Sequence, residues 1–279
     1  MINTGFIGGQ FGYRPLRRLG RDAAAEQGYC SGSAYSGISK LEALFGARIW
    51  NDLKQKSVLD FGCGTGREVI EIAQHGARRV VGLEMRRKVL DIGSRDAHSA
   101  GVAQRCIFTT HTDEKFDVIF SIDGFEHYDD AATVLRALHG LLQPGGRLYI
   151  AFGPTWFHSL GGHLFSVFPW VHLIFTEKAL LRWRADFKTD GARRFHEVEG
   201  GLNQMTIRHF RKLAENSDFE FLEFQPVPIK GLERLCNKWT QELFTSIVRC
   251  VLTPRMAHRP ASNDQDAAAG RRPDLDTAA

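Results

Sequence analysis

Short apolar runs alternate with amphipathic stretches from residue 57 onward. The apolar runs predict strands at 58–60, 79–84, 105–110, 116–122, 147–152, 219–224 and 244–252. The stretches between them carry apolar residues at helical spacing and predict helices at 67–75, 86–99, 131–142 and 205–216, the last with Thr206 as a candidate N-cap. Strands that alternate with helices are typical of an α/β fold, in which helices cover both faces of a mostly parallel sheet.

Three stretches lie outside this alternation. Residues 1–36 are rich in glycine and show no clear period, so we expect their first half to be mobile or to act as a lid. Residues 38–53 carry apolar residues at helical spacing and predict one amphipathic helix, which completes an N-terminal segment over 1–56. Residues 57–256 form the predicted domain, and the polar residues 257–279 predict a disordered tail.

An insertion at 153–203 separates the fifth predicted strand from the helix at 205–216. It is dense in aromatic residues, which are Trp156, Phe157, Phe165, Phe168, Trp170, Phe175, Trp183, Phe187 and Phe195. The insertion either packs a small satellite core or forms a cap over an apolar substrate, and both can hold. Its most apolar run, Phe165–Phe175, could also touch a membrane surface if the substrate is a lipid.

Composition excludes several classes of protein. The formal charge of +4 comes without a lysine- and arginine-rich run, so we expect no nucleic-acid partner. The most apolar run is too short to span a membrane, so we expect no integral membrane association. Residues 1–20 lack the apolar core of a secretory signal. The five cysteines show no zinc-type spacing and predict reduced thiols in a cytoplasmic protein.

A glycine-rich turn follows the first predicted strand. Gly62, Gly64 and Gly66 allow a tight turn and a close approach of the backbone to a ligand. The spacing is G-x-G-x-G, and Asp60 lies just before it. A carboxylate there repels a pyrophosphate but attracts a ligand that carries an ammonium and a sulfonium. Glu84 ends the second predicted strand, where a carboxylate can accept hydrogen bonds from both hydroxyls of a ribose.

At these residues the chain resembles the class I S-adenosylmethionine (SAM)-dependent methyltransferases, in particular the ubiquinone-biosynthesis-like group. The resemblance rests on four motifs in the order that the family has, namely 58–66, Glu84, 116–127 and 141–148. It implies a Rossmann-like class I methyltransferase fold, with a seven-stranded, mostly parallel sheet and an inserted aromatic-rich cap. It also implies SAM as the cofactor.

The resemblance assigns roles to individual residues. Asp60, Gly62 and Gly64 should hold the methionine end of SAM, Glu84 the ribose, and Met85 should pack against the adenine. His111 or Thr112 takes the adenine-edge role, although the loop after the third strand is shorter than the family usually has. The remaining residues that we expect at the cofactor are Cys63, Gly66 and Ser121.

Asp123, Glu126 and His127 follow the fourth predicted strand, at the edge where such sheets bind ligands. His127, with Asp123, is the candidate catalytic group, because methylation of a hydroxyl needs a base. Two alternatives remain open: the three side chains could bind a divalent metal, or Glu126 and His127 could brace the next helix. Our predicted site contains no metal. Arg67 opens the helix after the glycine turn, where a cation is unfavourable, so we expect an acidic partner for it.

The sequence therefore predicts a SAM-dependent methyltransferase that acts on a small organic acceptor, most simply at oxygen. A SAM-binding scaffold without activity and a methyltransferase for a lipid or macromolecule are the alternatives. A nicotinamide oxidoreductase would share the sheet and Glu84, but it should show G-x-G-x-x-G and no acid at Asp60. The oligomeric state does not follow from the sequence.

Overall fold

A twisted sheet forms the centre of the molecule. The computed structural model describes residues 5–20, 37–162, 165, 167–198 and 200–255. Their strands form one seven-stranded sheet in the order β3-β2-β1-β4-β5-β7-β6. The strands are β1 Ser57–Phe61, β2 Arg79–Leu83, β3 Cys106–Thr109, β4 Phe116–Ile122, β5 Leu142–Phe152, β6 Phe219–Pro228 and β7 Thr245–Pro254. β1 to β5 pair in parallel, and β7 is antiparallel to both β5 and β6. This arrangement confirms the predicted α/β class.

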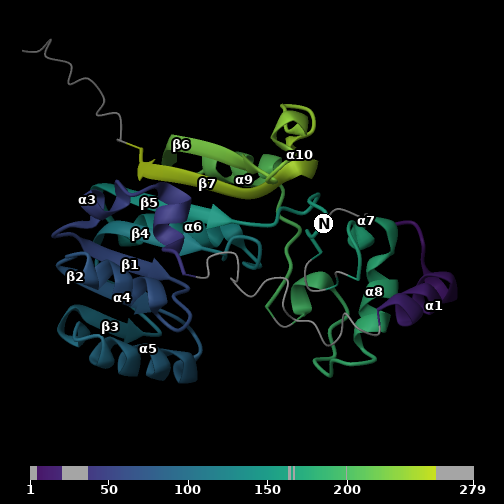
Figure 1. Ribbon diagram of the computed structural model, residues 1–279, viewed down its shortest axis with the longest axis horizontal. Coiled ribbons are helices and arrows are strands. Elements are labelled where there is room, and N and C mark those ends of the chain that lie inside the picture. The colour runs from purple at the N-terminus through teal and green to yellow at the C-terminus, as the bar shows by residue number, and fades with distance from the viewer. Residues whose placement is uncertain (1–4, 21–36, 163–164, 166, 199, 256–279) are drawn as a thin grey trace, which may run out of the picture.

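Helices cover both faces of the sheet (Figure 1). One face packs against α2 Lys40–Phe45, α3 Ile49–Leu53, α4 Arg67–Gln74 and α5 Arg87–Ser99. The other face packs against α6 Ala131–Leu141 and α9 Ile207–Glu215. Neighbouring strand residues face opposite ways, so that Val58 packs with the first group and Leu59 with the second. Thr206 caps α9 as predicted, since its hydroxyl accepts a hydrogen bond from His209 N (3.0 Å).

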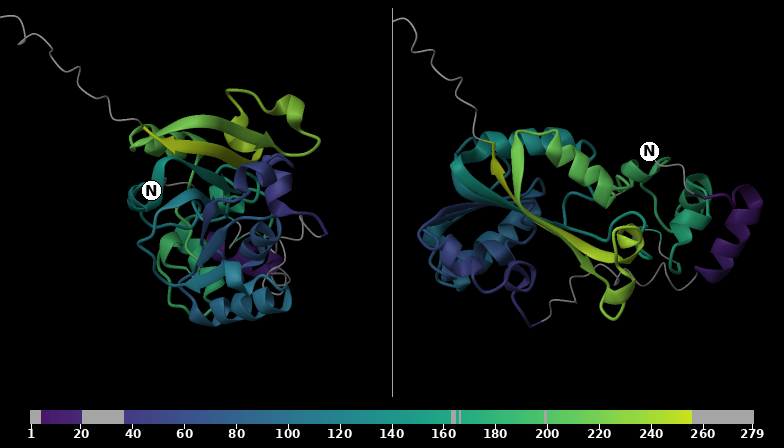
Figure 2. Two further views of the ribbon diagram at one scale, coloured as in Figure 1. Left: turned by 90° about the vertical axis from the view of Figure 1, so that its left-hand side faces the viewer. Right: turned by 90° about the horizontal axis from the view of Figure 1, so that it is seen from above.

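The insertion forms a separate body beside the sheet, as Figure 1 and the right-hand view of Figure 2 show. It contains α7 Val171–Ile174, α8 Glu177–Arg184 and the 3-10 helix η5 Phe195–Glu197. Its aromatic residues largely pack into a core of their own, in which Trp156, Phe165 and Phe195 are buried. The remaining elements are α1 Gly9–Leu19, the 3-10 helices η3 Ala103–Arg105 and η6 Glu233–Leu235, and α10 Gln241–Phe244.

The N-terminal residues differ from the expectation. Residues 9–19 form α1, which packs against α8 of the cap rather than remaining aperiodic. Ile7 forms a parallel bridge with Phe175, and Leu16 is fully buried in the cap core. The missing period has a physical reason: the buried positions of α1 and its C-cap are Gly12, Leu16 and Gly20, of which two are glycines that let the helices approach closely.

The helix expected over 38–53 is two helices. Gly46 ends α2 with a φ of 78°, a left-handed conformation that favours glycine, and α3 begins at Ile49. The predicted disordered tail at 257–279 lies outside the described residues, as do residues 21–36 of the predicted lid.

Candidate functional site

A cavity lies where the chain order of the sheet reverses. β1 and β4 are neighbours, and the strands that follow them in sequence lead away in opposite directions, which opens a crevice at their carboxyl ends. The cavity there has a volume of about 310 Å³. Its walls are Lys40, Asp60, Gly62, Cys63, Gly64, Thr65, Arg67, Glu68, Ile122 and Asp123. Five of the predicted site residues therefore come together: Asp60, Gly62, Cys63, Gly64 and Asp123.

The glycine turn is held against the end of β2. The N–H groups of Gly62 and Cys63 both donate to the carbonyl of Leu83, at 2.8 and 3.0 Å. This places the turn beside Glu84. Gly64 has a φ of 52°, and a Cβ at this position would meet no atom within 4 Å. The backbone at Gly64 is thus open to a ligand in the cavity.

Asp60 lies at the bottom of the site. Its side chain is only 4% exposed. Burial, with a smaller contribution from the charge of Glu68, raises the pKa of Asp60 to about 8, although the positive charge of Lys40 acts in the opposite direction. Asp60 is therefore largely protonated at neutral pH. A cationic ligand at this point would favour its ionised form.

Lys40 crosses the cavity from α2. Its Nζ lies 2.5 Å from Oδ2 of Asp123, and its side chain is 18% exposed. Asp123 has a φ of 52°, an uncommon conformation that aspartate tolerates better than most residues, and its N–H donates to Ala151 O (2.8 Å). Lys40 cannot be recognised as a site residue from the sequence, because it lies outside all four motifs and 83 positions before its partner.

Glu84 is held in place by Arg86. The carboxylate accepts hydrogen bonds from the Arg86 backbone N–H (3.0 Å) and from its guanidinium (3.1 Å at each oxygen). These bonds lower the pKa of Glu84. An ionised acid at the end of β2 can accept from ribose hydroxyls. Met85 next to it is 74% exposed, so its side chain offers an apolar surface instead of packing on the protein.

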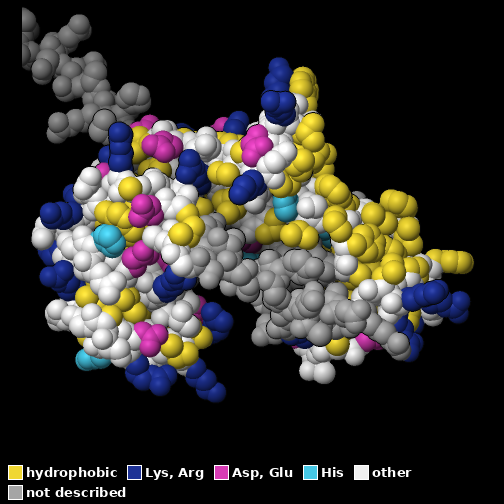
Figure 3. Space-filling view, viewed as in Figure 1, with side chains coloured by type: hydrophobic (Ala, Val, Ile, Leu, Met, Phe, Trp, Pro, Cys, Tyr) yellow, Lys and Arg dark blue, Asp and Glu magenta, His cyan; other side chains and the backbone are white. Residues whose placement is uncertain are grey.

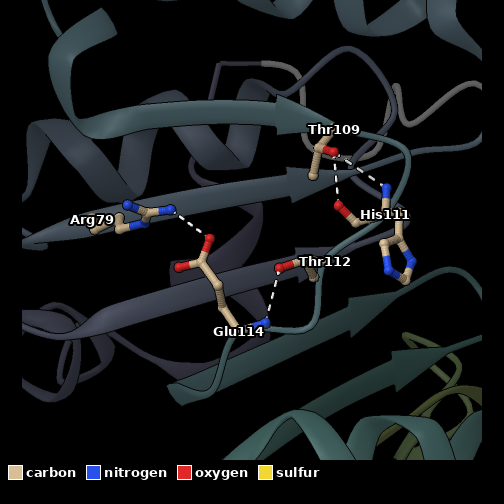
Figure 4. A network of polar contacts seen from close by, with 5 residues as sticks. All are labelled: Arg79, Thr109, His111, Thr112 and Glu114. Carbon is tan, nitrogen blue, oxygen red and sulfur yellow. Dashed lines mark hydrogen bonds and ion pairs between the residues drawn. The ribbon is translucent and has the colours of Figure 1, made fainter.

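His111 lies in the loop after β3, which is fixed by polar contacts shown in Figure 4. Thr109 Oγ1 accepts from the N–H of His111 (3.2 Å) and donates to its carbonyl (2.8 Å). Further along the loop, Thr112 Oγ1 accepts from Glu114 N (3.3 Å), and Glu114 pairs with Arg79 (2.6 Å). The imidazole ring takes part in none of these contacts. Glu84 N donates to Thr109 O (3.1 Å), so the loop begins next to Glu84.

Two predicted cofactor residues have other surroundings. Ser121 is fully buried and does not line the cavity, and its hydroxyl lies 3.1 Å from the hydroxyl of Tyr128. Gly66 has a φ of 78° at the start of α4, and a Cβ there would lie 2.3 Å from the ring of Phe108. Neither residue lines the cavity. Gly66 allows the start of α4 to pack closely against Phe108 of β3, and the Ser121 hydroxyl holds the hydroxyl of Tyr128.

His127 faces the end of the cap. Its Nδ1 lies 2.9 Å from the carbonyl oxygen of Gly201, which can only accept, so Nδ1 carries the hydrogen. In the neutral ring the lone pair is then on Nε2, which is the form that a base needs. His127 is not among the residues that line the cavity at Asp60.

Glu126 is buried at the joint between sheet and cap. Its Oε1 accepts from Gly153 N (3.3 Å) and its carbonyl accepts from Asn203 N (3.1 Å), so it contacts both ends of the insertion. Burial raises the pKa of Glu126 to about 8, to which the charge of Asp123 adds. Glu126 therefore braces the joint between sheet and insertion, whereas the start of the next helix, α6, is capped by Asp130. The metal alternative finds no support, since the described residues contain no group of three His, Cys, Asp or Glu side chains placed to hold a metal.

Two cavity residues remain. Cys63 is a buried thiol, and burial together with the nearby charge of Asp60 raises its pKa far above the usual range. Arg67 lines the cavity and forms no ion pair within the described part of the chain, so the expected acidic partner is not found there. Arg67 is instead a cation at the cavity wall.

The cap aromatics do not line this cavity. Trp156 is 1% exposed, and Trp170 donates through Nε1 to Phe157 O (3.1 Å). The apolar run 165–175 is also turned inward, with Phe165, Val171 and Phe175 buried, so these three residues do not offer a surface to a membrane. The satellite-core interpretation of the insertion is therefore correct for most of its aromatic residues.

Comparison with known protein families matches a stretch of the chain that contains every cavity-lining residue except Lys40. Residues 59–150 match the protein family described as a methyltransferase domain. The chain contains a methyltransferase domain. The matched residues include the glycine turn, Glu84, Asp123 and His127, whereas Lys40 and the cap lie outside them.

Curated relatives match between a third and a half of the chain. Ubiquinone biosynthesis O-methyltransferase of Aeromonas salmonicida is 35% identical over 102 residues, which make up 34% of this chain and 42% of that protein. The enzyme of the same name from Vibrio vulnificus is 29% identical over 136 residues, or 47% of this chain and 52% of that protein. The chain thus spans about half the length of these relatives.

A solved structure extends the likeness to most of the fold. A SAM-dependent methyltransferase from Mesorhizobium loti superposes with a TM-score of 0.53 at 16% identity and covers 79% of this chain and 100% of that chain. This match confirms the predicted Rossmann-like fold around the methyltransferase domain. In the described residues no helix is long and apolar enough to cross a membrane.

Proposed function

We propose that this chain is a SAM-dependent methyltransferase that methylates an oxygen atom of a small organic acceptor. The observation that carries the proposal is the cavity at the ends of β1 and β4. There a buried acid, Asp60, and the open backbone of Gly64 lie beside Glu84. The match of residues 59–150 to methyltransferase domains supports it.

Residues of the cavity and of the adjoining end of β2 can together contact each part of SAM. Asp60 and Asp123 can face the ammonium of the methionine end, and Lys40 and Arg67 can face its carboxylate. Glu84 can accept hydrogen bonds from the ribose hydroxyls, and exposed Met85 can cover one face of the adenine. When bound, SAM supplies a methyl group on a positively charged sulfur.

His127 is the proposed base. Methyl transfer needs the acceptor oxygen in line with the methyl group, and positioning supplies much of the acceleration. A hydroxyl acceptor must also lose its proton, which Nε2 of His127 can take because Nδ1 donates to Gly201 O. Glu126, the residue before His127, accepts a hydrogen bond from Gly153 N and so ties this loop to the start of the insertion. Asp123 acts on the cofactor side, where it pairs with Lys40, and not as a base.

The class of acceptor follows from the cap and the relatives. The insertion reaches His127 through the carbonyl of Gly201, and it contains more aromatic residues than lysines and arginines. This favours a small organic acceptor over a nucleic acid. The names of the curated relatives support oxygen as the methylated atom. We place the protein in the cytoplasm, because the described cysteines are free thiols.

Two measurements test the proposal. Calorimetry should show one SAM bound per chain, with S-adenosylhomocysteine as a second ligand. Incubation with SAM carrying a labelled methyl group and a metabolite extract should then transfer label to a small molecule. Binding without transfer to any extract would favour the scaffold alternative, and absence of SAM binding would refute the proposal.

A further inference from the structure

The outward side of α1 exposes large apolar side chains. Phe11 is 88% exposed and Leu19 is 60% exposed, and Phe6 just before the helix is 79% exposed. Positions 11, 15 and 19 follow one another at four-residue spacing, so Phe11, Pro15 and Leu19 share one side of the helix. Large apolar groups gathered on one side of a helix mark an interaction surface more often than isolated ones do.

Packing against the cap does not account for these side chains. α1 already buries a different stripe, Leu16 with Gly12 and Gly20 beside it, against α8. At Gly12 a Cβ would lie 2.9 Å from that of Ala179, so this side has no room for larger groups. The exposed stripe is therefore turned away from the body that holds the helix.

Positive charge borders the exposed stripe. Arg14 and Arg18 lie three and seven positions after Phe11, on the edge of the stripe away from Leu16, and Arg17 lies beyond them. The helix contains no acidic residue. Figure 3 shows hydrophobic and basic side chains together at the end of the molecule that α1 forms. We call Phe6, Phe11, Arg14, Pro15, Arg18 and Leu19 the α1 face.

The connection between β6 and β7 repeats this combination. Trp239 is 83% exposed and Leu235 is 50% exposed, with Lys238 and Arg234 next to them in sequence. In Figure 3 hydrophobic side chains follow the margin of the molecule from this connection, above α10, toward the cap. A second group of the same chemistry thus lies along the margin that leads to the α1 face.

We propose that the α1 face docks on the surface of an anionic lipid membrane. Phe11 and Leu19 enter the boundary between headgroups and acyl chains, and Arg14 and Arg18 pair with lipid phosphates. A helix with an apolar stripe, bordering arginines and no acids has the chemistry of interfacial membrane helices. α1 lies at one end of the molecule (Figure 1), where a planar membrane surface can reach it. The connection above α10 provides a second contact through Trp239.

Vesicle sedimentation tests this proposal. We expect the full chain to sediment with vesicles of equal parts phosphatidylcholine and phosphatidylglycerol, and at least about tenfold less with phosphatidylcholine alone. Phe11→Ser/Leu19→Ser should lower the partition coefficient by about tenfold or more. Arg14→Glu/Arg18→Glu should abolish the preference for anionic vesicles. Ile92→Ser with Arg87→Glu is the matched control, because it removes an exposed apolar and a basic residue from α5.

The outcomes separate docking from folding and from methyl transfer. Each variant changes exposed side chains, so its melting temperature and SAM affinity should equal those of the wild type, and the readout needs no acceptor. Equal sedimentation with both vesicle types, or equal sedimentation of the wild type and Phe11→Ser/Leu19→Ser, would overturn the proposal. A dimer in light scattering that the Phe11→Ser/Leu19→Ser change dissolves would also overturn it, since the face would then bind a second copy.

Discussion

Changing Asp60 to asparagine removes the charge that we place opposite the cationic end of SAM. Without ligand the pKa of Asp60 is about 8, against an ordinary value of 3.8. With that pKa about one molecule in a hundred carries the ionised carboxylate at pH 6, and about half do at pH 8. If SAM binds only the ionised form, its affinity should rise about fiftyfold between pH 6 and pH 8. Asp60→Asn should bind more weakly and lose this dependence.

Calorimetry in two buffers of different ionisation enthalpy measures the effect directly. Near pH 6.5 the wild type should release about one proton for each SAM bound, because Asp60 starts protonated and ends ionised. Asp218→Asn, which removes an exposed carboxylate far from the cavity, should leave the release unchanged. A SAM affinity that stays constant from pH 6 to pH 8, with no proton release, would refute the assignment of Asp60 to the cationic end of the ligand.

The titration of Asp60 also makes the free energy of unfolding depend on pH. The folded chain holds a proton on Asp60 that the unfolded chain loses above about pH 4, because burial raises the folded-state pKa. The free energy of unfolding should therefore fall as pH rises from about 4 to 8. Asn is neutral at every pH, so Asp60→Asn should fold and should lack this component. Its melting curve across the same range serves as the check that weak SAM binding is not caused by unfolding.

Four further substitutions separate the parts of the site. Glu84→Ala should weaken SAM binding by about 1.5–3 kcal/mol in calorimetry, because the ribose loses a charged acceptor, whereas Arg86→Ala should weaken it much less. Gly64→Val should abolish binding, since its side chain would fill open space at the turn; normal affinity would place the ligand elsewhere. His127→Ala should lower turnover by about 10²–10⁴-fold at unchanged SAM affinity, with partial recovery at high pH, and wild-type turnover would exclude it as base. Trp156→Ala should lower the free energy of unfolding by about 3–5 kcal/mol, because the side chain is buried in the cap core, and a change in acceptor affinity without one in stability would contradict this.

The sheet could be predicted from sequence because its signals are local. β4 begins and ends where the apolar pattern predicts, at Phe116 and Ile122, and the glycine turn lies at the end of β1 as expected. The cofactor residues that the structure brings into the cavity are those next to this turn. Gly66, assigned from the glycine spacing, and Ser121, assigned with the fourth-strand motif, do not line the cavity and instead contact Phe108 and Tyr128.

The rest depends on contacts between distant parts of the chain. In the sequence Lys40 is an ordinary polar residue, and only the fold places its Nζ 2.5 Å from Oδ2 of Asp123, which follows β4. The buried stripe of α1 cannot be recognised from the sequence, because two of its three positions are glycines, Gly12 and Gly20. The aromatic insertion suggests a substrate pocket or a core equally well, and only the burial of Trp156 and Phe165 decides for the core. Such features are set by tertiary packing, which spacing along the sequence does not record.

The bridge between Ile7 and Phe175 affects how the chain can be assembled and cut. During synthesis Ile7 leaves the ribosome roughly 170 residues ahead of its partner, so Leu16 of α1 stays exposed until the cap is made. Attachment of α1 should accordingly be a late step of folding. Cleavage between residues 20 and 37 would leave a short N-terminal peptide held to the cap by Leu16 and by hydrogen bonds to Ile174. A separate peptide of residues 5–20 should accordingly bind to the cap of a chain from which these residues have been removed.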